Sequence, residues 1–288
     1  ALGGYTAGHF AGEILEAYPF IDAVVRGEGE RPLADLAAWA RSGRPDLSDI
    51  PNLSWRGPDG RPRHNPVGYC TSAAELDAAD FAALRFFRHP EIVCRLGWVV
   101  PWEGPVRLVQ RLGRGQREAV IHGAFAGRGC PGACTWCGGS GPGVRRSTGR
   151  AETARRHPDR VAESVARLRA EWGIERFYFC FDPDPAVEEP TAALLAALGR
   201  LRPRVRADFE FFGLPSPELC RLFRLALHHR STIILSPETA DEALRRAHRA
   251  YPFSNAEFED RLDWLDRLRT PTVLYFAIGL PGETAAGM

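Results

Sequence analysis

The chain of 288 residues is long enough for one large domain, or for one domain and part of a second. Its 37 Lys and Arg residues balance 36 Asp and Glu residues, so the net charge of +1 gives no reason to expect nucleic acid or an anionic membrane surface as a partner. No apolar run could span a bilayer, and the odd number of cysteines, seven, argues against a secreted disulfide scaffold, so a reducing, cytoplasmic setting without a membrane partner is expected.

The first 45 residues alternate between strand and helix. Residues 1–4 read as the exit from a buried strand, residues 10–18 and 30–43 have helical patterns, and residues 21–27 form a short buried strand. Such alternation implies parallel α/β structure. Residues 46–117 are rich in Pro, Gly and Arg, and we expect them to form a connector that could contain small hairpins.

Five apolar segments from residue 118 onwards alternate with helical patterns. The predicted strands are residues 118–126, 176–181, 205–212, 231–236 and 272–279. Two of the helices have clear start signals, namely Ser216 followed by Pro217 and the capping box of Ser254 and Glu257. Five strands with helical crossovers predict a parallel barrel or an open parallel sheet.

Both ends of the sequence look like interior parts of a fold. The chain begins as the exit from a strand, and it ends with a strand and its loop but no following helix. We therefore expect a fragment, with a barrel core over residues 118–288 that lacks its C-terminal end.

Three cysteines stand close together in "GRGCPGACTWCGGS", residues 127–140. They are separated by three residues and then by two, on a loop rich in glycine. A 4Fe–4S cube is normally held by four thiolates, so a loop with three leaves one iron open to a small ligand. A zinc site with His122 or Cys180 as the fourth ligand is the alternative, and chance is another. The other cysteines are dispersed, and we expect most of Cys70, Cys94, Cys180 and Cys220 to be small core residues.

Cys130-Pro-Gly-Ala-Cys134-Thr-Trp-Cys137 resembles the CxxxCxxC loop of radical S-adenosylmethionine (SAM) enzymes. "FYFCFDPDP", "ILSPETADEALRRAHRAY" and "AIGLPGET" resemble later motifs of that family, in the same order along residues 118–288. The resemblance implies an incomplete parallel (βα) barrel of radical SAM type, a 4Fe–4S cluster on the three cysteines, and SAM on the open iron. The reduced cluster then cleaves SAM to give a 5′-deoxyadenosyl radical, with an electron donor such as flavodoxin or ferredoxin.

The resemblance also implies roles at SAM for four other residues. Trp136 is expected beside the adenine, unless it is an ordinary core tryptophan. Glu238 is expected at the ribose or the amino group, or else as a charge at the start of a helix. Asp182 lies where relatives carry SAM contacts or an acidic turn, and Gly279 belongs to a loop that flanks the adenine. Glu283, in the same loop, is either part of that loop's shape or a surface residue.

The N-terminal segment resembles the last part of the Rossmann-like cobalamin-binding domain in one radical SAM subgroup. There a Gly pair, here Gly3 and Gly4, ends a strand against the nucleotide tail of the cofactor, and a run like "FIDAVVRGEGE" closes the domain. The Gly27–Glu30 turn is otherwise a simple link from strand to helix. The Asp-x-His-x-x-Gly segment of cobalamin proteins is absent, so we expect cobalamin to be held well only by a more complete protein.

Three functions follow from these observations. The first is a cobalamin-dependent radical SAM enzyme, such as a methyltransferase acting at an unactivated carbon of a small molecule or natural product. The second keeps the cluster and SAM without cobalamin, for a rearrangement, cyclisation or methylthiolation. The third is a zinc-stabilised binding module without catalysis.

Overall fold

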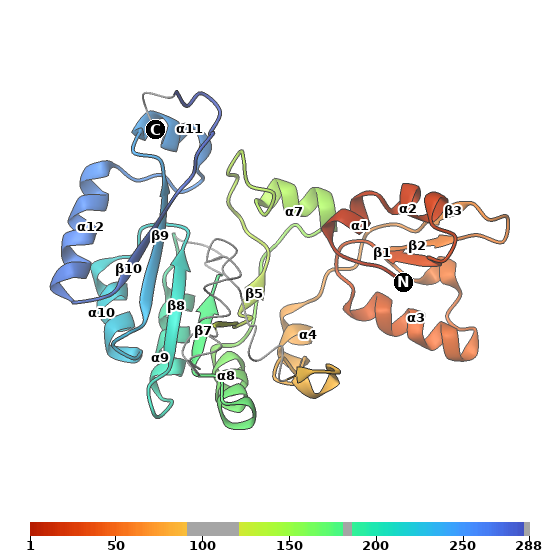
Figure 1. Cartoon of the computed structure of the whole chain (residues 1–288), viewed down its shortest axis with the longest axis horizontal. Helices are drawn as coiled ribbons and strands as arrows, with labels where there is room; N and C mark the ends of the chain where they lie inside the picture. The colour runs from red at the N-terminus through yellow and green to blue at the C-terminus, as the bar shows by residue number, and fades with distance from the viewer. Residues whose placement is uncertain (91–120, 181–185, 285–288) are drawn as a thin grey trace. The chain divides into compact units, whose positions relative to one another are not determined.

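The computed structural model describes residues 1–90, 121–180 and 186–284 (Figure 1). The chain divides into two compact units, which we describe separately. Unit 1 comprises Ala1–Glu75, Gly129–Ala133 and Cys137–Ala154, and unit 2 comprises Leu76–Arg128, Cys134–Trp136 and Arg155–Met288. Within the described ranges, no helix has both the length and the apolar composition needed to cross a bilayer.

Unit 2 is built on a parallel sheet of five strands in the order β10-β9-β8-β7-β4. The strands are β4 (Ile121–Gly123), β7 (Arg176–Phe179), β8 (Arg206–Phe211), β9 (Thr232–Glu238) and β10 (Thr272–Phe276). Each strand pairs with the next one along the chain, which is the winding of a parallel barrel. The α/β class, the five strands and the parallel sheet predicted from the sequence are therefore confirmed.

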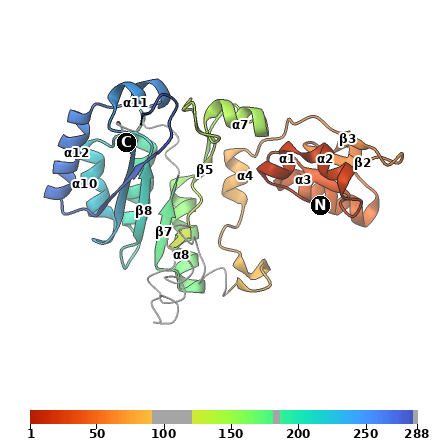
Figure 2. The same ribbon diagram turned by 45° about the horizontal axis from the view of Figure 1, so that its top comes forward.

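Helices connect these strands and cover one face of the sheet (Figure 1, Figure 2). The covering helices are α8 (Pro158–Trp172), α9 (Glu189–Gly199), α10 (Pro217–Ala226) and α12 (Asn255–Arg267). The short helix α11 (Glu242–His248) lies beyond the carboxyl end of β9 (Figure 1). The predicted start signals are confirmed, because the Ser216 hydroxyl accepts the Leu219 N–H and Ser254 forms a capping box with Glu257. Two further short elements of unit 2 are the 3-10 helix η2 (Leu84–Phe86) and strand β5 (Gly127–Arg128).

The core of unit 2 lies between the sheet and its helices. Phe177 and Phe179 of β7 are buried there, while the alternate residues Arg176 and Tyr178 point to the opposite face and carry polar contacts. On α8 the predicted stripe is confirmed, with Val161, Val165 and Leu168 buried and Trp172 packed against the same cluster. Alternation on the strands and helical spacing on α8 therefore bury one face of each element.

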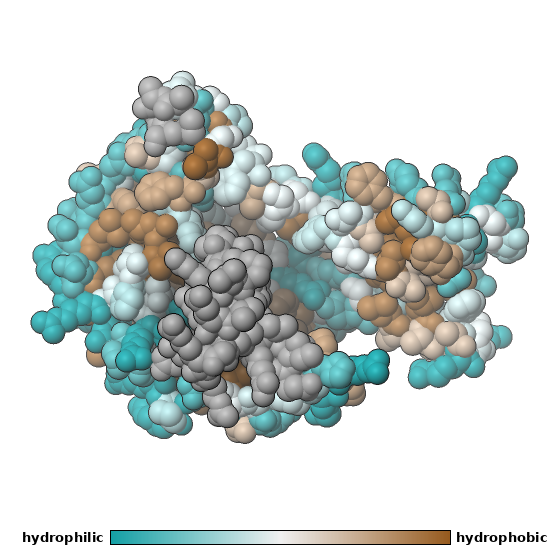
Figure 3. Space-filling view, viewed as in Figure 1, coloured by the Kyte–Doolittle hydropathy of each residue, from teal (hydrophilic) through white to brown (hydrophobic). Residues whose placement is uncertain are grey.

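One edge of the described sheet is apolar and uncovered. Strand β10 pairs with β9 alone among the described strands. Phe276 is 58% exposed and Ile278, two residues beyond it, is 83% exposed. In Figure 3, hydrophobic side chains gather over the part of the molecule that contains β10. An exposed apolar strand edge favours association with other chains.

Unit 1 contains an antiparallel sheet and several helices. Its elements are α1 (Tyr5–His9), α2 (Ala11–Ala17), β1 (Ala23–Val25), α3 (Glu30–Ser42), η1 (Leu47–Asp49), β2 (Leu53–Arg56), β3 (Pro62–His64) and α7 (Gly141–Thr148). Two elements, α4 (Ala73–Ala78) and β6 (Ala154–Arg155), each contain one of the boundaries between the units. Leu2 forms a parallel bridge with Val24, as expected of a strand exit, and α3 ends at the left-handed Gly43.

The segment after residue 45 takes part in the same sheet. Strand β2 pairs with β1 and β3 in antiparallel register, so the order is β1-β2-β3. A hairpin expected within the connector is formed by β2 and β3. Because β2 also pairs with β1, this hairpin belongs to unit 1, whose first segment ends at Glu75. Residues 91–117 of the expected connector lie outside the described residues.

Candidate functional site

The three cysteines lie on the loop between β5 and α7. Cys130, Cys134 and Cys137 are half-buried thiols. Two of the sulfur atoms accept a backbone hydrogen bond, Cys130 Sγ from Gly132 N–H and Cys134 Sγ from Ala250 N–H, each at 3.3 Å. N–H donors of this kind stabilise a thiolate and tune an iron–sulfur cluster. In the described parts of the chain no group of three or more His, Cys, Asp or Glu side chains is gathered to hold a metal, so common ligation stays a prediction.

The residues of the loop suit a bulky inorganic group. Three thiolates are a soft donor set, which iron–sulfur clusters and zinc prefer. A Cβ on Gly139 would lie 3.6 Å from Cys137 Sγ, and one on Gly141 would lie 2.8 Å from the carbonyl oxygen of Cys130. The contact at Gly139 leaves room for a side chain, whereas the absence of a side chain at Gly141 lets the backbone pass close to the Cys130 carbonyl.

The middle of the loop is fixed to the C-terminal half of unit 2. Thr135 N–H donates to the carbonyl of His248 at 3.0 Å. His248 Nε2 lies 2.8 Å from the Pro281 carbonyl, which can only accept, so Nδ1 is left to accept the Thr135 hydroxyl at 2.7 Å. Trp136 follows with 43% of its surface exposed, which does not fit an ordinary core tryptophan.

Glu238 is the last residue of β9 and lies in the left-handed region, with φ of 67°. Its Oε1 atom lies 3.0 Å from Nη1 of Arg249, and both residues are buried. Burial raises the pKa of Glu238, although Arg249 opposes the change. Burial lowers the pKa of Arg249, against the attraction of Glu238 and of the Cys134 thiolate.

Glu238 does not serve as a charge at the start of a helix. The side chain of Asp241 caps α11 by accepting the N–H groups of Ala243 and Leu244. Arg249 also donates to the backbone carbonyls of Ser236 and Phe212, which fixes its guanidinium under the end of β9. The role of Arg249 was not predicted from the sequence, because several arginines follow Glu238 in "ILSPETADEALRRAHRAY".

A second carboxylate lies on the neighbouring strand. Glu210 of β8 accepts hydrogen bonds from Tyr178 and, at 3.3 Å each, from the thiol of Cys180 and the hydroxyl of Ser236. Burial and the bond to Glu210 raise the pKa of Tyr178. The signal in the sequence was the alternation of charged and apolar residues along β8, with Arg206, Asp208 and Glu210 at every second position. These groups and Glu238 form a polar network near the carboxyl ends of β7, β8 and β9, where parallel barrels carry their active sites.

The loop after β10 is a tight turn. Gly279 has φ of 90°, and its N–H donates to the Glu283 carboxylate at 2.6 Å. Leu280 N–H donates to the same carboxylate at 3.2 Å, so Glu283 shapes the loop and is more than a surface residue. Asp182 lies outside the described residues.

Gly3 and Gly4 are exposed residues of unit 1. Gly4 precedes α1 with φ of 94°, and nothing lies within 4 Å of the position of its Cβ. A Cβ on Gly3 would lie 3.7 Å from the carbonyl oxygen of Val25. The backbone at this pair is thus open to a close approach from outside.

The other cysteines differ in burial. Cys220 is fully buried, and burial raises its pKa to about 12, as expected of a core residue. Cys180 is exposed and so is not one of the expected core cysteines, because it follows the last residue of β7 on the polar face. Cys70 is half-buried, and Cys94 lies outside the described residues.

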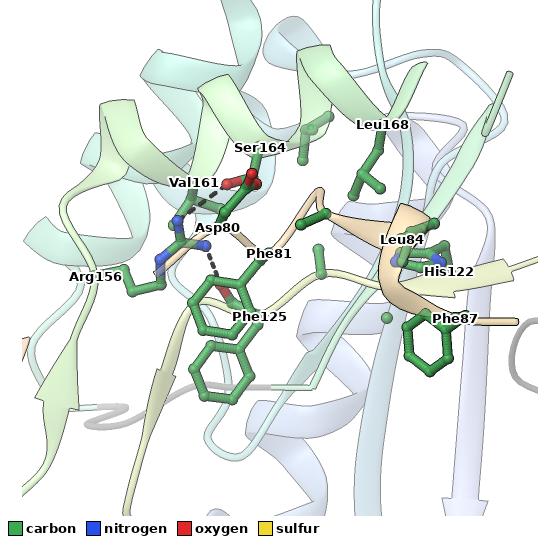
Figure 4. Close-up of a pocket in the computed structure, with 14 residues that line it drawn as sticks. Asp80, Phe81, Leu84, Phe87, His122, Phe125, Arg156, Val161, Ser164 and Leu168 are labelled. Carbon is green, nitrogen blue, oxygen red and sulfur yellow. Dashed lines mark hydrogen bonds between the residues drawn. The ribbon is translucent and has the colours of Figure 1, made fainter. Parts of the chain in front are cut away.

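His122, the other candidate for a fourth zinc ligand, lies on β4 beside a cavity of about 310 Å³. Its imidazole contacts the ring of Phe177, and burial lowers its pKa. Figure 4 shows His122 with Leu84 and Phe87 at one end of the cavity. At the other end Phe81 stacks on Phe125 with ring centres 4.6 Å apart. This cavity lies between η2, β4 and α8, and none of the three loop cysteines lines it.

The chain is similar in sequence or in fold to several known proteins. The anaerobic magnesium-protoporphyrin IX monomethyl ester cyclase of Synechocystis sp. is 27% identical over 177 residues, which are 62% of this chain and 29% of the cyclase. The structure of the radical SAM methyltransferase TsrM from Kitasatospora setae, with cobalamin and a [4Fe–4S] cluster bound, aligns with a TM-score of 0.68 and 18% identity, over 99% of this chain and 51% of TsrM.

The cobalamin-dependent SAM radical enzyme OxsB, with aqua-cobalamin and SAM bound, aligns with a TM-score of 0.63 and 14% identity. The alignment covers 95% of this chain and 35% of OxsB. The chain thus spans about half or less of these proteins, and the two structures show a shared fold. The profile of the Radical SAM superfamily matches residues 125–287, more than half of the sequence. With its CxxxCxxC loop and parallel sheet, the chain belongs to the radical SAM superfamily.

Proposed function

We propose that the chain is the catalytic part of a cobalamin-dependent radical SAM enzyme that methylates an unactivated carbon of a small molecule or natural product. One observation carries the cobalamin part of the proposal. The likeness to TsrM covers 99% of the chain and so includes unit 1, which lies largely outside the superfamily match of residues 125–287. An electron donor such as flavodoxin or ferredoxin and a cytoplasmic location belong to the same proposal.

The radical SAM superfamily uses a 4Fe–4S cluster and SAM, and here Cys130, Cys134 and Cys137 are the proposed cluster ligands. When bound, these cofactors supply an electron and a carbon radical, and cobalamin supplies a carrier for a methyl group. The protein has to position the groups and exclude water. The N–H donors of Gly132 and Ala250 orient two of the sulfur atoms.

Glu238 and Trp136 are the proposed contacts of SAM. The Glu238 carboxylate is buried and held by Arg249, whose guanidinium is close enough to be affected by the Cys134 thiolate. A fixed acceptor beside the cluster loop can hold the amino or hydroxyl groups of SAM. The exposed ring of Trp136 offers a face for the adenine.

Anaerobic reconstitution tests the cluster. The wild-type chain should bind about four irons, the content of one cube. Replacing Cys130, Cys134 or Cys137 by Ala should abolish the broad visible absorbance, whereas the control Cys220→Ala, in the core of unit 2, should retain it. A triple cysteine variant with unchanged iron would refute the assignment, and zinc in place of iron would favour the binding module.

Electron paramagnetic resonance of the reduced cluster, with and without SAM, tests the open iron. The spectrum should change when SAM is added. Glu238→Gln should keep the cluster but weaken SAM binding, by on the order of 1–3 kcal/mol if one charged hydrogen bond is lost. A spectrum that does not respond to SAM in the wild-type chain would remove the basis for radical chemistry.

Cobalamin is tested by absorbance titration with hydroxocobalamin. Gly4→Ala places a methyl group on the open face beside Gly3 and should abolish the binding seen with the wild type. Gly43→Ala is the matched control, because Gly43 also has a positive φ and open space around its Cβ position but ends α3 instead. Equal titration of both variants and the wild type would favour the enzyme without cobalamin.

A further inference from the structure

A buried ion pair in unit 1 joins the turn after β1 to the segment after α7. Glu28 and Arg150 are each 7% exposed, and two bonds connect them, Nε to Oε1 at 2.5 Å and Nη2 to Oε2 at 2.8 Å. Thr71 completes the arrangement, since its N–H donates to Glu28 at 2.7 Å and its carbonyl accepts from Arg150 at 2.5 Å. A two-bond pair between Arg and a carboxylate fixes orientation as well as distance.

The side chain of Arg150 also lies against the start of the cysteine loop. A Cβ on Gly129 would be 3.1 Å from Arg150 Cδ and 3.2 Å from the carbonyl oxygen of Glu152, to which Arg150 Nη1 donates. Gly129 has φ of 88°, a conformation that other residues rarely adopt. The backbone directly before Cys130 therefore rests on a side chain whose position Glu28 determines.

Helix α7 contacts the backbone on the other side of Cys130 and leads directly to Arg150. At its first residue, Gly141 N–H donates to the Gly132 carbonyl at 2.7 Å, and a Cβ there would be 2.8 Å from the Cys130 carbonyl oxygen. At its other end the helix stops at Gly149, and Arg150 follows. Gly27 supports this end, because a Cβ on it would be 3.1 Å from the backbone of Thr148.

From this geometry we propose that Glu28 and Arg150 are positioning residues for Cys130. The pair holds Gly129 from one side and, through α7, the Cys130–Gly132 backbone from the other. The inference rests on the proposed function, because it takes Cys130 as a cluster ligand. A buried ion pair is weak evidence for stability alone, since apolar residues of similar size often serve as well. Placement of the loop is the role that needs this directional pair.

The test compares Glu28→Gln with the wild-type chain after anaerobic reconstitution. The substitution keeps the volume of the side chain and removes its charge. Removing a residue that supports a metal ligand typically weakens metal affinity by about tenfold or more, so Glu28→Gln should lose iron to a chelator about tenfold faster. The spectrum of the reduced cluster should broaden or shift. Arg150→Lys should not preserve the site, because an ammonium cannot make the two-bond contact.

Leu15→Ala is the matched control. Leu15 is fully buried in unit 1 in a cluster with Ala11 and Val24, apart from the residues that hold the loop. The substitution Leu15→Ala should lower the stability of unit 1 but leave iron retention and the spectrum of the reduced cluster unchanged. If Leu15→Ala loses iron as fast as Glu28→Gln, or if Glu28→Gln behaves as the wild type, the positioning role is wrong.

Hydrogen exchange of the cluster-free protein separates this inference from the proposed function. Glu28→Gln should raise exchange in residues 129–140 more than in β1, whereas Leu15→Ala should raise it mainly in β1 and α2. Equal changes in the loop for the two variants would overturn the inference. A wild-type chain that takes up no cluster would overturn the proposed function, while the exchange result still decides whether the pair orders the loop.

Discussion

Replacement of Arg249 by Gln should destabilise the carboxyl end of β9 in a pH-dependent way. The side chains of Arg249 and Glu238 are only 5% and 12% exposed, so the substitution leaves a buried carboxylate without its charge partner. It also removes donors from the carbonyls of Ser236 and Phe212. Loss of one member of a buried pair costs about 3–5 kcal/mol, and we expect about 3 kcal/mol near pH 8, because Glu238 can take up a proton.

The sign of the pH dependence follows from the pKa of Glu238. Burial already raises it above the ordinary value of 4.5, and Arg249 is the group that opposes this rise. In the variant the folded state therefore binds a proton more tightly than the unfolded state. Stability is then greatest below the unfolded pKa and falls as the pH rises through the folded pKa. The deficit should be clearly smaller near pH 5 than near pH 8.

Native-state hydrogen exchange of the β9 amides is the appropriate assay. A single global unfolding curve reports on a chain of two compact units and does not isolate this strand. The control is the double variant Glu238→Gln/Arg249→Gln, which removes the stranded charge and should recover about 1 kcal/mol or more. An equal deficit at both pH values, with no recovery in the double variant, would show that the charge pair is not what stabilises this end of β9.

Three further predictions concern other parts of the chain. Hydrogen bonds from Arg150 and Thr71 outweigh burial and lower the pKa of Glu28 to about 2, from an ordinary value of 4.5. The stability that this shift contributes to unit 1 should therefore be present above pH 4.5 and be lost as the pH falls towards 2. Acid unfolding followed by circular dichroism should show this pH-dependent loss in the wild type but not in Glu28→Gln. Ile278→Lys should slow aggregation in light scattering without altering the unfolding midpoint, because Ile278 is 83% exposed beyond the edge strand β10; an unchanged rate would mean that this edge does not drive association. Ser254→Ala should lower the free energy of unfolding by about 1 kcal/mol in urea, because it breaks the capping box of α12, and a change indistinguishable from zero would contradict that role.

The elements of unit 2 could be predicted because their signals are local. The caps at Ser216 and Ser254 act on N–H groups three residues away, and the stripe of Val161, Val165 and Leu168 follows helical spacing. The thiols of the cysteine loop are likewise recognisable from their spacing alone. Residues 46–75 were harder, because the pairing of β2 with β1 depends on segments about 30 residues apart.

The sequence by itself determined the α/β class, the five strands with their helical crossovers and the candidate ligands of the cluster, since each depends on neighbours along the chain. The tertiary structure alone decided which charges meet. Glu28 binds Arg150, which is 122 positions away in the sequence. Glu238 pairs with Arg249, whereas Asp241 caps helix α11. With 37 basic and 36 acidic residues in the chain, composition cannot select such pairs. They form where the fold removes both partners from water, because a buried charge is tolerated only beside an opposite one.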